Sequence, residues 1–256
     1  MTTHKGDAMS ESTERMAQTG TDALPYRDAS LSTAERARDL LERMTTAEKL
    51  AQLGSLWSFE IFDGQTLDRA SAEERLSEGL GQVTRVAGAT NLPPSKVAAF
   101  GDAIQRYLVE ETRLGVPAIL HEETLHGVMA RDATCFPQAI GLAATWDTTM
   151  AEAMARRLGH HLRAIGASQA LAPVLDITRD PRWGRLEETY GEDPYLAAAM
   201  GCAYVRGIQE TPAGERPVFA TGKHMVGHGL PEGGLNQAQA HIGMRELLDT
   251  FLFPFE

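Results

Sequence analysis

Residues 150–177 read MAEAMARRLGHHLRAIGASQALAPVLDI, and this stretch decides the class of fold. Apolar side chains recur in its first part at helical spacing, namely at Met150, Met154, Leu158, Leu162 and Ile165. That spacing predicts an amphipathic helix with one face packed on a sheet. The apolar run at 170–177 follows directly and predicts a strand. The stretch therefore forms one helix–strand unit.

The same alternation continues on both sides of this unit. Short apolar runs predict further strands at 83–88, 116–120, 141–146 and 218–222. Helical patterns cover 95–112 and 194–209, and another helix begins near Met244. Near the N-terminus, capping residues start one helix at Ser32 or Thr33 and a second at 45–48. Strands alternating with helices predict βαβ units and a parallel sheet.

Two α/β folds contain such units, the doubly wound dinucleotide-binding fold and the (β/α)8 barrel. A glycine motif distinguishes the first from the second. A dinucleotide-binding fold requires G-x-G-x-x-G after its first strand. The run at 79–84 has Thr84 in place of the third glycine, and the run that begins Gly227-His228-Gly229 also fails there. The sequence has no Walker A motif. We therefore favour a (β/α)8 barrel, and the five or six candidate strands make it an incomplete one.

The composition of the chain limits the class of protein to which it can belong. The 256 residues are 43% hydrophobic and 23% charged, with a net charge of −11, which is typical of a globular protein rather than a nucleic-acid binder. Cys135 and Cys202 are too few for a disulfide framework or a zinc ribbon. No apolar leader or membrane-spanning run is present, so we expect a cytoplasmic protein. Residues 1–30 are predicted to be a disordered polar tail before a barrel domain at 31–256.

Polar residues gather after the strand at 116–120. The run His121-Glu122-Glu123-Thr124-Leu125-His126-Gly127 resembles a zinc motif, but its histidines are five apart rather than the four that H-E-x-x-H requires. A carboxylate at a strand end can accept two hydroxyl donors, which suits a sugar. It can equally cap the next helix.

Arginines dominate the second cluster. Thr178-Arg179-Asp180-Pro181-Arg182-Trp183-Gly184-Arg185 is followed by Glu187 and Glu188. Arginine binds carboxylates through two parallel hydrogen bonds, so we expect most of these residues to stiffen the loop and one arginine to reach a ligand. Phosphate binding is less favoured, because it usually recruits a glycine-rich helix start as well.

The third cluster is Lys223-His224, after the strand at 218–222. Lys223 is one of only four lysines, and at a strand end it can donate to ligand hydroxyls. A Schiff-base role, as in an aldolase, is the competing interpretation. His224 and His228 have a spacing that could bind metal, but no third ligand lies nearby in the sequence. We interpret 231–234 as a mobile loop rather than a site.

These motifs occur together in a known order. The order is Gly115-Val116-Pro117, Glu123-x-x-His126-Gly127, Phe136-Pro137-Gln138, Ala172-Pro173-Val174-Leu175-Asp176, the arginine motif at 179–185, Gly191-Glu192-Asp193-Pro194 and Lys223-His224. From about residue 31 to the last residue, the chain resembles the N-terminal domain of glycoside hydrolase family 3.

The resemblance implies a retaining β-glycosidase without a cofactor or a metal, which releases terminal non-reducing β-D-glucose from β-linked oligosaccharides or from aryl and alkyl glycosides. It also implies that Glu123, Arg185, Lys223 and His224 hold the sugar hydroxyls. Glu123 stands where many members have Asp, so glucose and xylose both stay open. Leu235 stands where relatives often have Arg. No nucleic acid or membrane is expected as a partner.

The family's nucleophile is an Asp in a Ser-Asp-aromatic motif, which this sequence lacks. We expect that Asp, and the acid/base residue, beyond Glu256, in a missing C-terminal part of the same enzyme. The chain is then the front of a longer enzyme and is inactive alone. The alternatives are an exo-β-xylosidase of the same family, a non-catalytic sugar-binding barrel, and an aldolase that uses Lys223.

Overall fold

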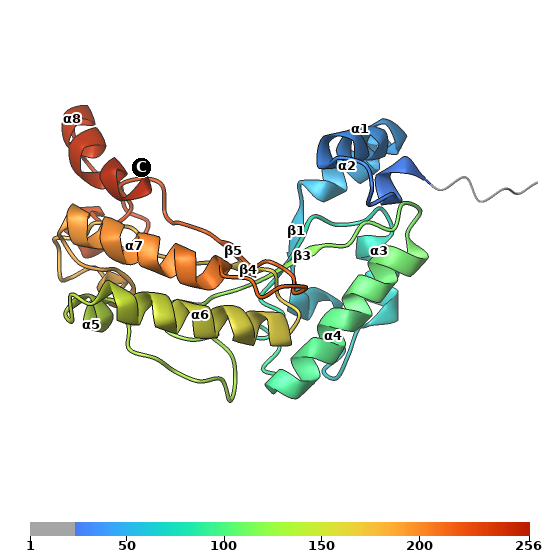
Figure 1. Ribbon diagram of the computed structural model, residues 1–256, viewed down its shortest axis with the longest axis horizontal. Coiled ribbons are helices and arrows are strands. Elements are labelled where there is room, and N and C mark those ends of the chain that lie inside the picture. The colour runs from blue at the N-terminus through green and yellow to red at the C-terminus, as the bar shows by residue number, and fades with distance from the viewer. Residues whose placement is uncertain (1–23) are drawn as a thin grey trace, which may run out of the picture. The chain divides into compact units, whose positions relative to one another are not determined.

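The computed structural model describes residues 24–256 (Figure 1). These residues form two compact units. The first unit ends at Lys49 and the second runs from Leu50 to Glu256. None of the helices in the described part of the chain is long and apolar enough to cross a membrane.

The first unit is built around α1 (Thr33–Arg43), and α2 (Thr46–Gln52) begins within it. Ser32 caps α1 as the sequence predicts, because its hydroxyl accepts from the Glu35 amide at 3.3 Å while the Glu35 carboxylate accepts from the Ser32 amide at 3.0 Å. The predicted tail at 1–30 is only partly described. Residues 1–23 lie outside the described residues. The prediction is wrong for the rest, since Pro25–Arg27 form a 3-10 turn with Tyr26 buried.

Five parallel strands form the sheet of the second unit. They are β1 (Ser55–Trp57), β2 (Gln82–Thr84), β3 (Ile119–Glu122), β4 (Gln169–Ala170) and β5 (Phe219–Ala220). Their spatial order is their chain order, β1-β2-β3-β4-β5. A doubly wound sheet reverses direction at a switch point, whereas a barrel keeps adding strands on the same side. The α/β fold of the incomplete (β/α)8 barrel type is confirmed.

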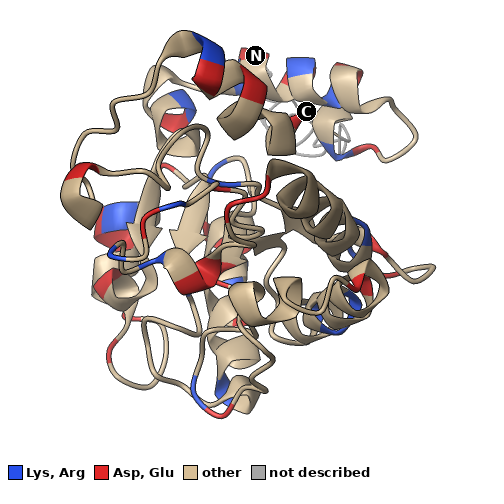
Figure 2. Cartoon of the chain, turned by 90° about the vertical axis from the view of Figure 1, so that its left-hand side faces the viewer, with Lys and Arg blue, Asp and Glu red and all other residues tan. Residues whose placement is uncertain are grey.

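Helices lie between successive strands, and one more follows β5. They are α3 (Arg69–Leu76), α4 (Pro94–Arg106), α5 (Ala139–Ala143), α6 (Thr148–Ala164), α7 (Pro194–Gln209) and α8 (Met244–Glu246). Wider π-type turns follow α4 at Tyr107–Glu111 and α8 at Leu247–Leu252. The long helices α6 and α7 pack side by side (Figure 1), close enough that a Cβ atom on Gly159 would lie 2.9 Å from the Ile208 carbonyl oxygen. Their solvent sides carry ion pairs, and Figure 2 shows basic residues interspersed with acidic ones.

The predicted elements are partly corrected. The predicted strand at 141–146 is wrong, because α5 and a turn occupy it. The true first strand, β1, was not predicted. The predicted strand at 170–177 contributes only Ala170 to β4, and Val174 then makes an isolated bridge to Lys223. The predicted strand at 218–222 contributes Phe219–Ala220.

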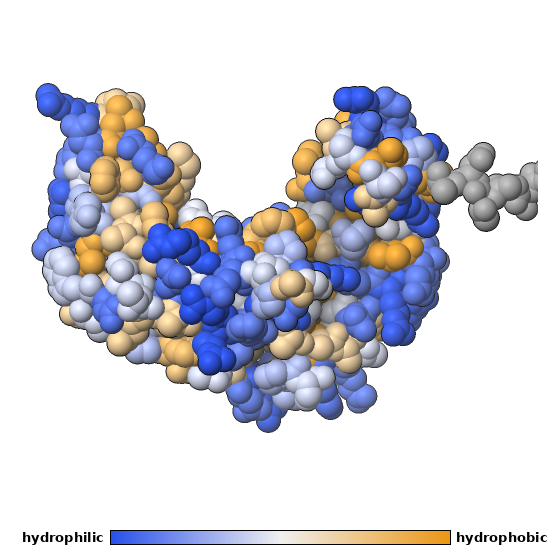
Figure 3. Space-filling view, viewed as in Figure 1, coloured by the Kyte–Doolittle hydropathy of each residue, from blue (hydrophilic) through white to orange (hydrophobic). Residues whose placement is uncertain are grey.

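The two faces of the sheet differ in burial. Leu56, Val83 and Leu120 are in register on neighbouring strands and are buried with the helices in the core. Alternate residues point to the opposite face, where Trp57 on β1 is 43% exposed and Phe219 on β5 is 53% exposed, whereas His121 on the central strand β3 is buried. The C-terminal helical segment from Met244 also presents apolar surface (Figure 3).

Candidate functional site

Glu123 and Lys223 form the centre of a polar cluster at the carboxyl ends of β3 and β5. The Lys223 Nζ atom lies 3.0 Å from Glu123 Oε1 and 2.8 Å from Oε2, although 100 residues separate the two in the chain. The Lys223 side chain is 13% exposed and the Glu123 side chain is 24% exposed. A mostly buried ion pair that still reaches solvent can exchange its internal contacts for contacts with a ligand.

The backbone before Asp176 holds Lys223 in place. The Lys223 amide donates to the Pro173 carbonyl at 3.0 Å, and the Leu175 amide donates to the Lys223 carbonyl at 2.6 Å. The Ala172–Pro173 and Lys223–His224 peptide bonds are cis. The two backbone hydrogen bonds keep the segment after β4 beside the segment after β5 up to the site.

His224 is anchored by a buried carboxylate. Asp176 Oδ2 accepts from the His224 backbone amide at 3.1 Å and lies 2.7 Å from the ring Nδ1. The Asp176 side chain is fully buried, whereas the His224 side chain is 32% exposed. The carboxylate thus lies beneath the ring and the ring faces outward.

Arg185 is held on two sides. Its guanidinium binds the Glu188 carboxylate through two bonds of 2.9 and 2.6 Å, and its Nη1 lies 3.4 Å from His228 Nε2. The hydrogen bonds that Arg185 donates to Glu188 are the main reason why the pKa of Arg185 is raised, and Glu123 and Asp176 add smaller contributions. The four predicted site residues therefore belong to one cluster of interacting charged and polar side chains. They are Glu123, Arg185, Lys223 and His224.

Two other arginines of this loop bind carboxylates, which agrees with the prediction that most of these residues stiffen the loop. Arg179 bonds to Glu246 at 2.9 Å and lies over the Phe251 ring. Arg182 bonds to Asp180, and this partner lowers the pKa of Asp180 to about 2. That Arg185 is the arginine that reaches a ligand stays a prediction.

His228 and the loop after it complete the cluster. The His228 ring lies 4.6 Å from the His224 ring and 5.3 Å from Trp183, edge to face. The segment 231–234 was predicted to be a mobile loop, but Glu232–Gly234 form a 3-10 turn that Pro231 precedes, and Pro231 and Gly234 are buried. A Cβ atom on Gly234 would lie 2.7 Å from that of Arg182, so this turn packs directly on the arginine loop.

Two buried residues lie on β3 just before Glu123. His121 bonds to Thr84 through Nε2 at 3.2 Å, and burial lowers its pKa. Glu122 is fully buried, and burial raises its pKa to about 7 against the opposing effect of two backbone amides. Sequence reasoning did not select Asp176, Glu122 or Glu188 as site residues. Asp176 at the end of an apolar run carried the clearest signal, because a charged residue is rarely buried without a partner.

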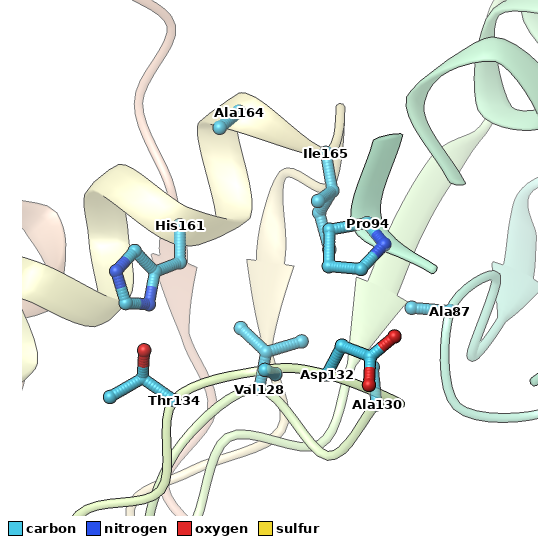
Figure 4. A pocket seen from close by; sticks show the side chains of 10 residues that line it. Ala87, Pro94, Val128, Ala130, Asp132, Thr134, His161, Ala164 and Ile165 are labelled. Carbon is cyan, nitrogen blue, oxygen red and sulfur yellow. The ribbon is translucent and has the colours of Figure 1, made fainter. Parts of the chain in front are cut away.

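Within the described residues, no three His, Cys, Asp or Glu side chains gather as a metal site would require. The pocket in Figure 4 is separate from the polar cluster. It has a volume of about 180 Å³ and is mostly apolar, and its lining includes Val128, His161 and Ile165 rather than the four predicted residues. The polar cluster at the strand ends is therefore the candidate site.

Known proteins resemble the chain over most of its length. The family model described as Glycosyl hydrolase family 3 N terminal domain matches residues 45–256. A putative beta-xylosidase of Formosa agariphila is 30% identical over 246 residues, which are 93% of this chain and 32% of that protein. A periplasmic beta-glucosidase/beta-xylosidase of Dickeya chrysanthemi is 33% identical over 82% of this chain and 34% of its own length.

Solved structures also resemble the chain over most of its length. A β-glucosidase from Erythrobacter marinus has a TM-score of 0.81 and 36% identity, over 91% of this chain and 31% of that one. A β-glucosidase from Listeria innocua, solved in complex with glucose, has a TM-score of 0.75 and 28% identity over 88% of this chain and 31% of that one. The chain spans about a third of the length of the proteins it matches.

Proposed function

The chain belongs to glycosyl hydrolase family 3, and on that premise we propose that it supplies the sugar-binding part of a retaining β-glycosidase. The enzyme releases terminal non-reducing β-D-glucose from β-glucosides. Glu123, Arg185, Lys223 and His224 hold the hydroxyls of that glucose. The observation that supports this most strongly is the Glu123–Lys223 pair, because it places a double acceptor beside a triple donor at the ends of two strands.

Neighbouring sugar hydroxyls need such a pair. Each hydroxyl both donates and accepts, so one can donate to a Glu123 oxygen while the next accepts from Lys223 Nζ. Hydrogen bonds to charged groups are stronger than neutral ones, and the low exposure of both side chains limits competition from water.

The charges of the site suit a neutral sugar. Each basic side chain has its own carboxylate, with Lys223 on Glu123, Arg185 on Glu188 and His224 on Asp176. No unpaired cation among them calls for a phosphate or carboxylate on the substrate. Glucose and xylose both fit that description, and relatives named beta-xylosidase make an exo-β-xylosidase the alternative.

The proposal assigns the nucleophile and the acid/base residue to sequence beyond Glu256. The threefold greater length of the matched relatives supports this assignment. In a retaining enzyme the nucleophilic carboxylate attacks the anomeric carbon and a second group protonates the leaving oxygen, and water then releases the sugar. The residues of this chain bind and orient the ring for that attack. A non-catalytic sugar-binding barrel would use the same four residues.

Calorimetric titration with glucose and with xylose tests the proposal. We expect saturable binding of one of these sugars to the 256-residue chain, and Lys223→Ala should weaken it by about tenfold or more, because a hydrogen bond to a charged group contributes about 1.5–3 kcal/mol. Lys96→Ala is the matched control, since Lys96 is exposed on α4. Equal affinity in the Lys223 and Lys96 variants, or no binding of either sugar, would contradict the proposal.

A further inference from the structure

Asp176 has a fully buried carboxylate that accepts hydrogen bonds from one residue, His224. Its Oδ2 accepts from both the backbone amide and the ring Nδ1 of His224, at 3.1 and 2.7 Å. Its Oδ1 is buried and has no hydrogen-bond partner among the described residues. Burying a charge costs free energy unless the charge is paired. The hydrogen bonds from His224 therefore offset the cost of burying this carboxylate.

The position of Asp176 is fixed from two sides. The segment just before it pairs with Lys223 itself, through the Leu175 amide and the Pro173 carbonyl. On the other side, Gly229 approaches so closely that a Cβ atom there would lie 2.5 Å from the Ile177 carbonyl oxygen and 3.1 Å from the Asp176 Cβ atom. Asp176 therefore has little freedom to turn away from His224.

The hydrogen bond determines which ring nitrogen carries the proton. A carboxylate only accepts, so the Nδ1 atom of His224 is protonated, and in the neutral ring Nε2 is then an acceptor. A free imidazole side chain mostly carries its proton on Nε2. Asp176 thus reverses the common tautomer and changes the exposed nitrogen from a donor into an acceptor.

His228 is the other group that faces the His224 ring. Burial, together with the neighbouring His224 and Arg185, lowers the pKa of His228, so its ring is neutral at pH 7. Its Nε2 lies 3.4 Å from Arg185 Nη1, and a guanidinium only donates. Both histidines therefore carry the proton on Nδ1. Because the His228 ring is neutral, it places no charge against the His224 ring.

We propose that Asp176 is a positioning residue, which holds His224 in the Nδ1-protonated tautomer so that Nε2 accepts a hydrogen bond from a sugar hydroxyl. This inference rests on the proposed function for its ligand, but its central part concerns the ring alone. The site then offers two acceptors, Glu123 and His224, and two donors, Lys223 and Arg185. Such a mixed set matches a polyol, because each of its hydroxyls can both donate and accept a hydrogen bond.

Long-range proton–nitrogen NMR of the imidazole rings tests the tautomer directly. We expect the His224 signals of the 256-residue chain, assigned with His224→Gln, to show a protonated Nδ1 and an unprotonated Nε2. In Asp176→Ala they should shift to the common tautomer, and glucose affinity should fall by about tenfold. In Asp176→Asn the amide oxygen can still accept both N–H groups, so the tautomer should be kept.

Asp180→Asn is the matched control, because Asp180 lies in the following loop and bonds to Arg182 instead. It should leave the His224 signals unchanged. A protonated Nε2 in the unsubstituted chain overturns the proposal without any variant. Loss of the tautomer in Asp176→Asn, or its retention in Asp176→Ala, also overturns it. Absence of sugar binding by the unsubstituted chain contradicts the proposed function alone and leaves the tautomer result standing.

Discussion

Glu122 should make the stability of the chain fall as the pH rises. The carboxyl is fully buried on β3 and accepts from the Ala87 amide at 2.5 Å and the Gly88 amide at 3.3 Å. Burial raises its pKa from 4.5 to about 7, although these two amides and Arg85 oppose the rise. Between those pH values the folded chain keeps a proton that the unfolded chain has already released.

The size of the effect follows from proton linkage. Stability falls with rising pH wherever the folded state binds more protons than the unfolded state. The interval from 4.5 to about 7, at about 1.4 kcal/mol for each pH unit, corresponds to about 3 kcal/mol. The loss begins near pH 4.5 and is complete above pH 7. Aspartates with lowered pKa values, such as Asp180, produce the opposite slope at lower pH, so a variant must isolate the contribution of Glu122.

Glu122→Gln is that variant, because its amide cannot ionise and its oxygen can still accept from Ala87. Urea unfolding of both proteins at pH 4.5 to 8, followed by the fluorescence of the buried Trp183, gives the free energies of unfolding. We expect the variant to gain about 3 kcal/mol relative to the unsubstituted chain across this range. Glu78→Gln, at an exposed position, is the control. A difference between the two proteins that does not change with pH would refute the reasoning.

Three further predictions concern packing and activity. Gly207→Ala on α7 should lower the free energy of unfolding by about 2 kcal/mol or more, because its Cβ would collide with the Glu152 carbonyl oxygen on α6. Gly141→Ala on α5 is the control, since its Cβ meets open space and should be neutral or stabilising by up to about 1 kcal/mol. Equal urea midpoints for the two variants would contradict this. Leu158→Ala should cost about 2–5 kcal/mol in the same assay, because Leu158 is fully buried on α6; a cost below about 1 kcal/mol would be inconsistent with this packing. The 256-residue chain should not release nitrophenol from an aryl β-glucoside faster than a buffer blank, and turnover that Lys223→Ala abolishes would show that this chain holds its own catalytic groups.

The sequence predicted long periodic elements better than short ones. The helix at 194–209 was predicted with the bounds that α7 has, since an Asp-Pro start and an apolar stripe define it. The run at 141–146 has no period, and its alanines favour the five-residue helix α5 that the structure contains. β1 has three residues, too few to show an alternating pattern.

The site was predicted in part for a similar reason. Glu123 and Lys223 could be selected because both follow apolar runs, and parallel strands bring such ends together. Their direct contact depends on the path of the segment before Asp176, which local sequence patterns do not specify. Asp176 ends one of the motifs in the sequence, but its contacts are with His224, which lies 48 residues away in the chain.

A crystal structure of the 256-residue chain with glucose at a saturating concentration tests the central claim most directly. The account predicts one glucose at the ends of β3 and β5, with hydroxyls within hydrogen-bond distance of the Glu123 carboxylate and Lys223 Nζ, and with the Glu123–Lys223 bonds of 3.0 and 2.8 Å lengthened or replaced. Glucose in the apolar pocket beside Val128, or an unchanged ion pair with no sugar on it, would contradict the account.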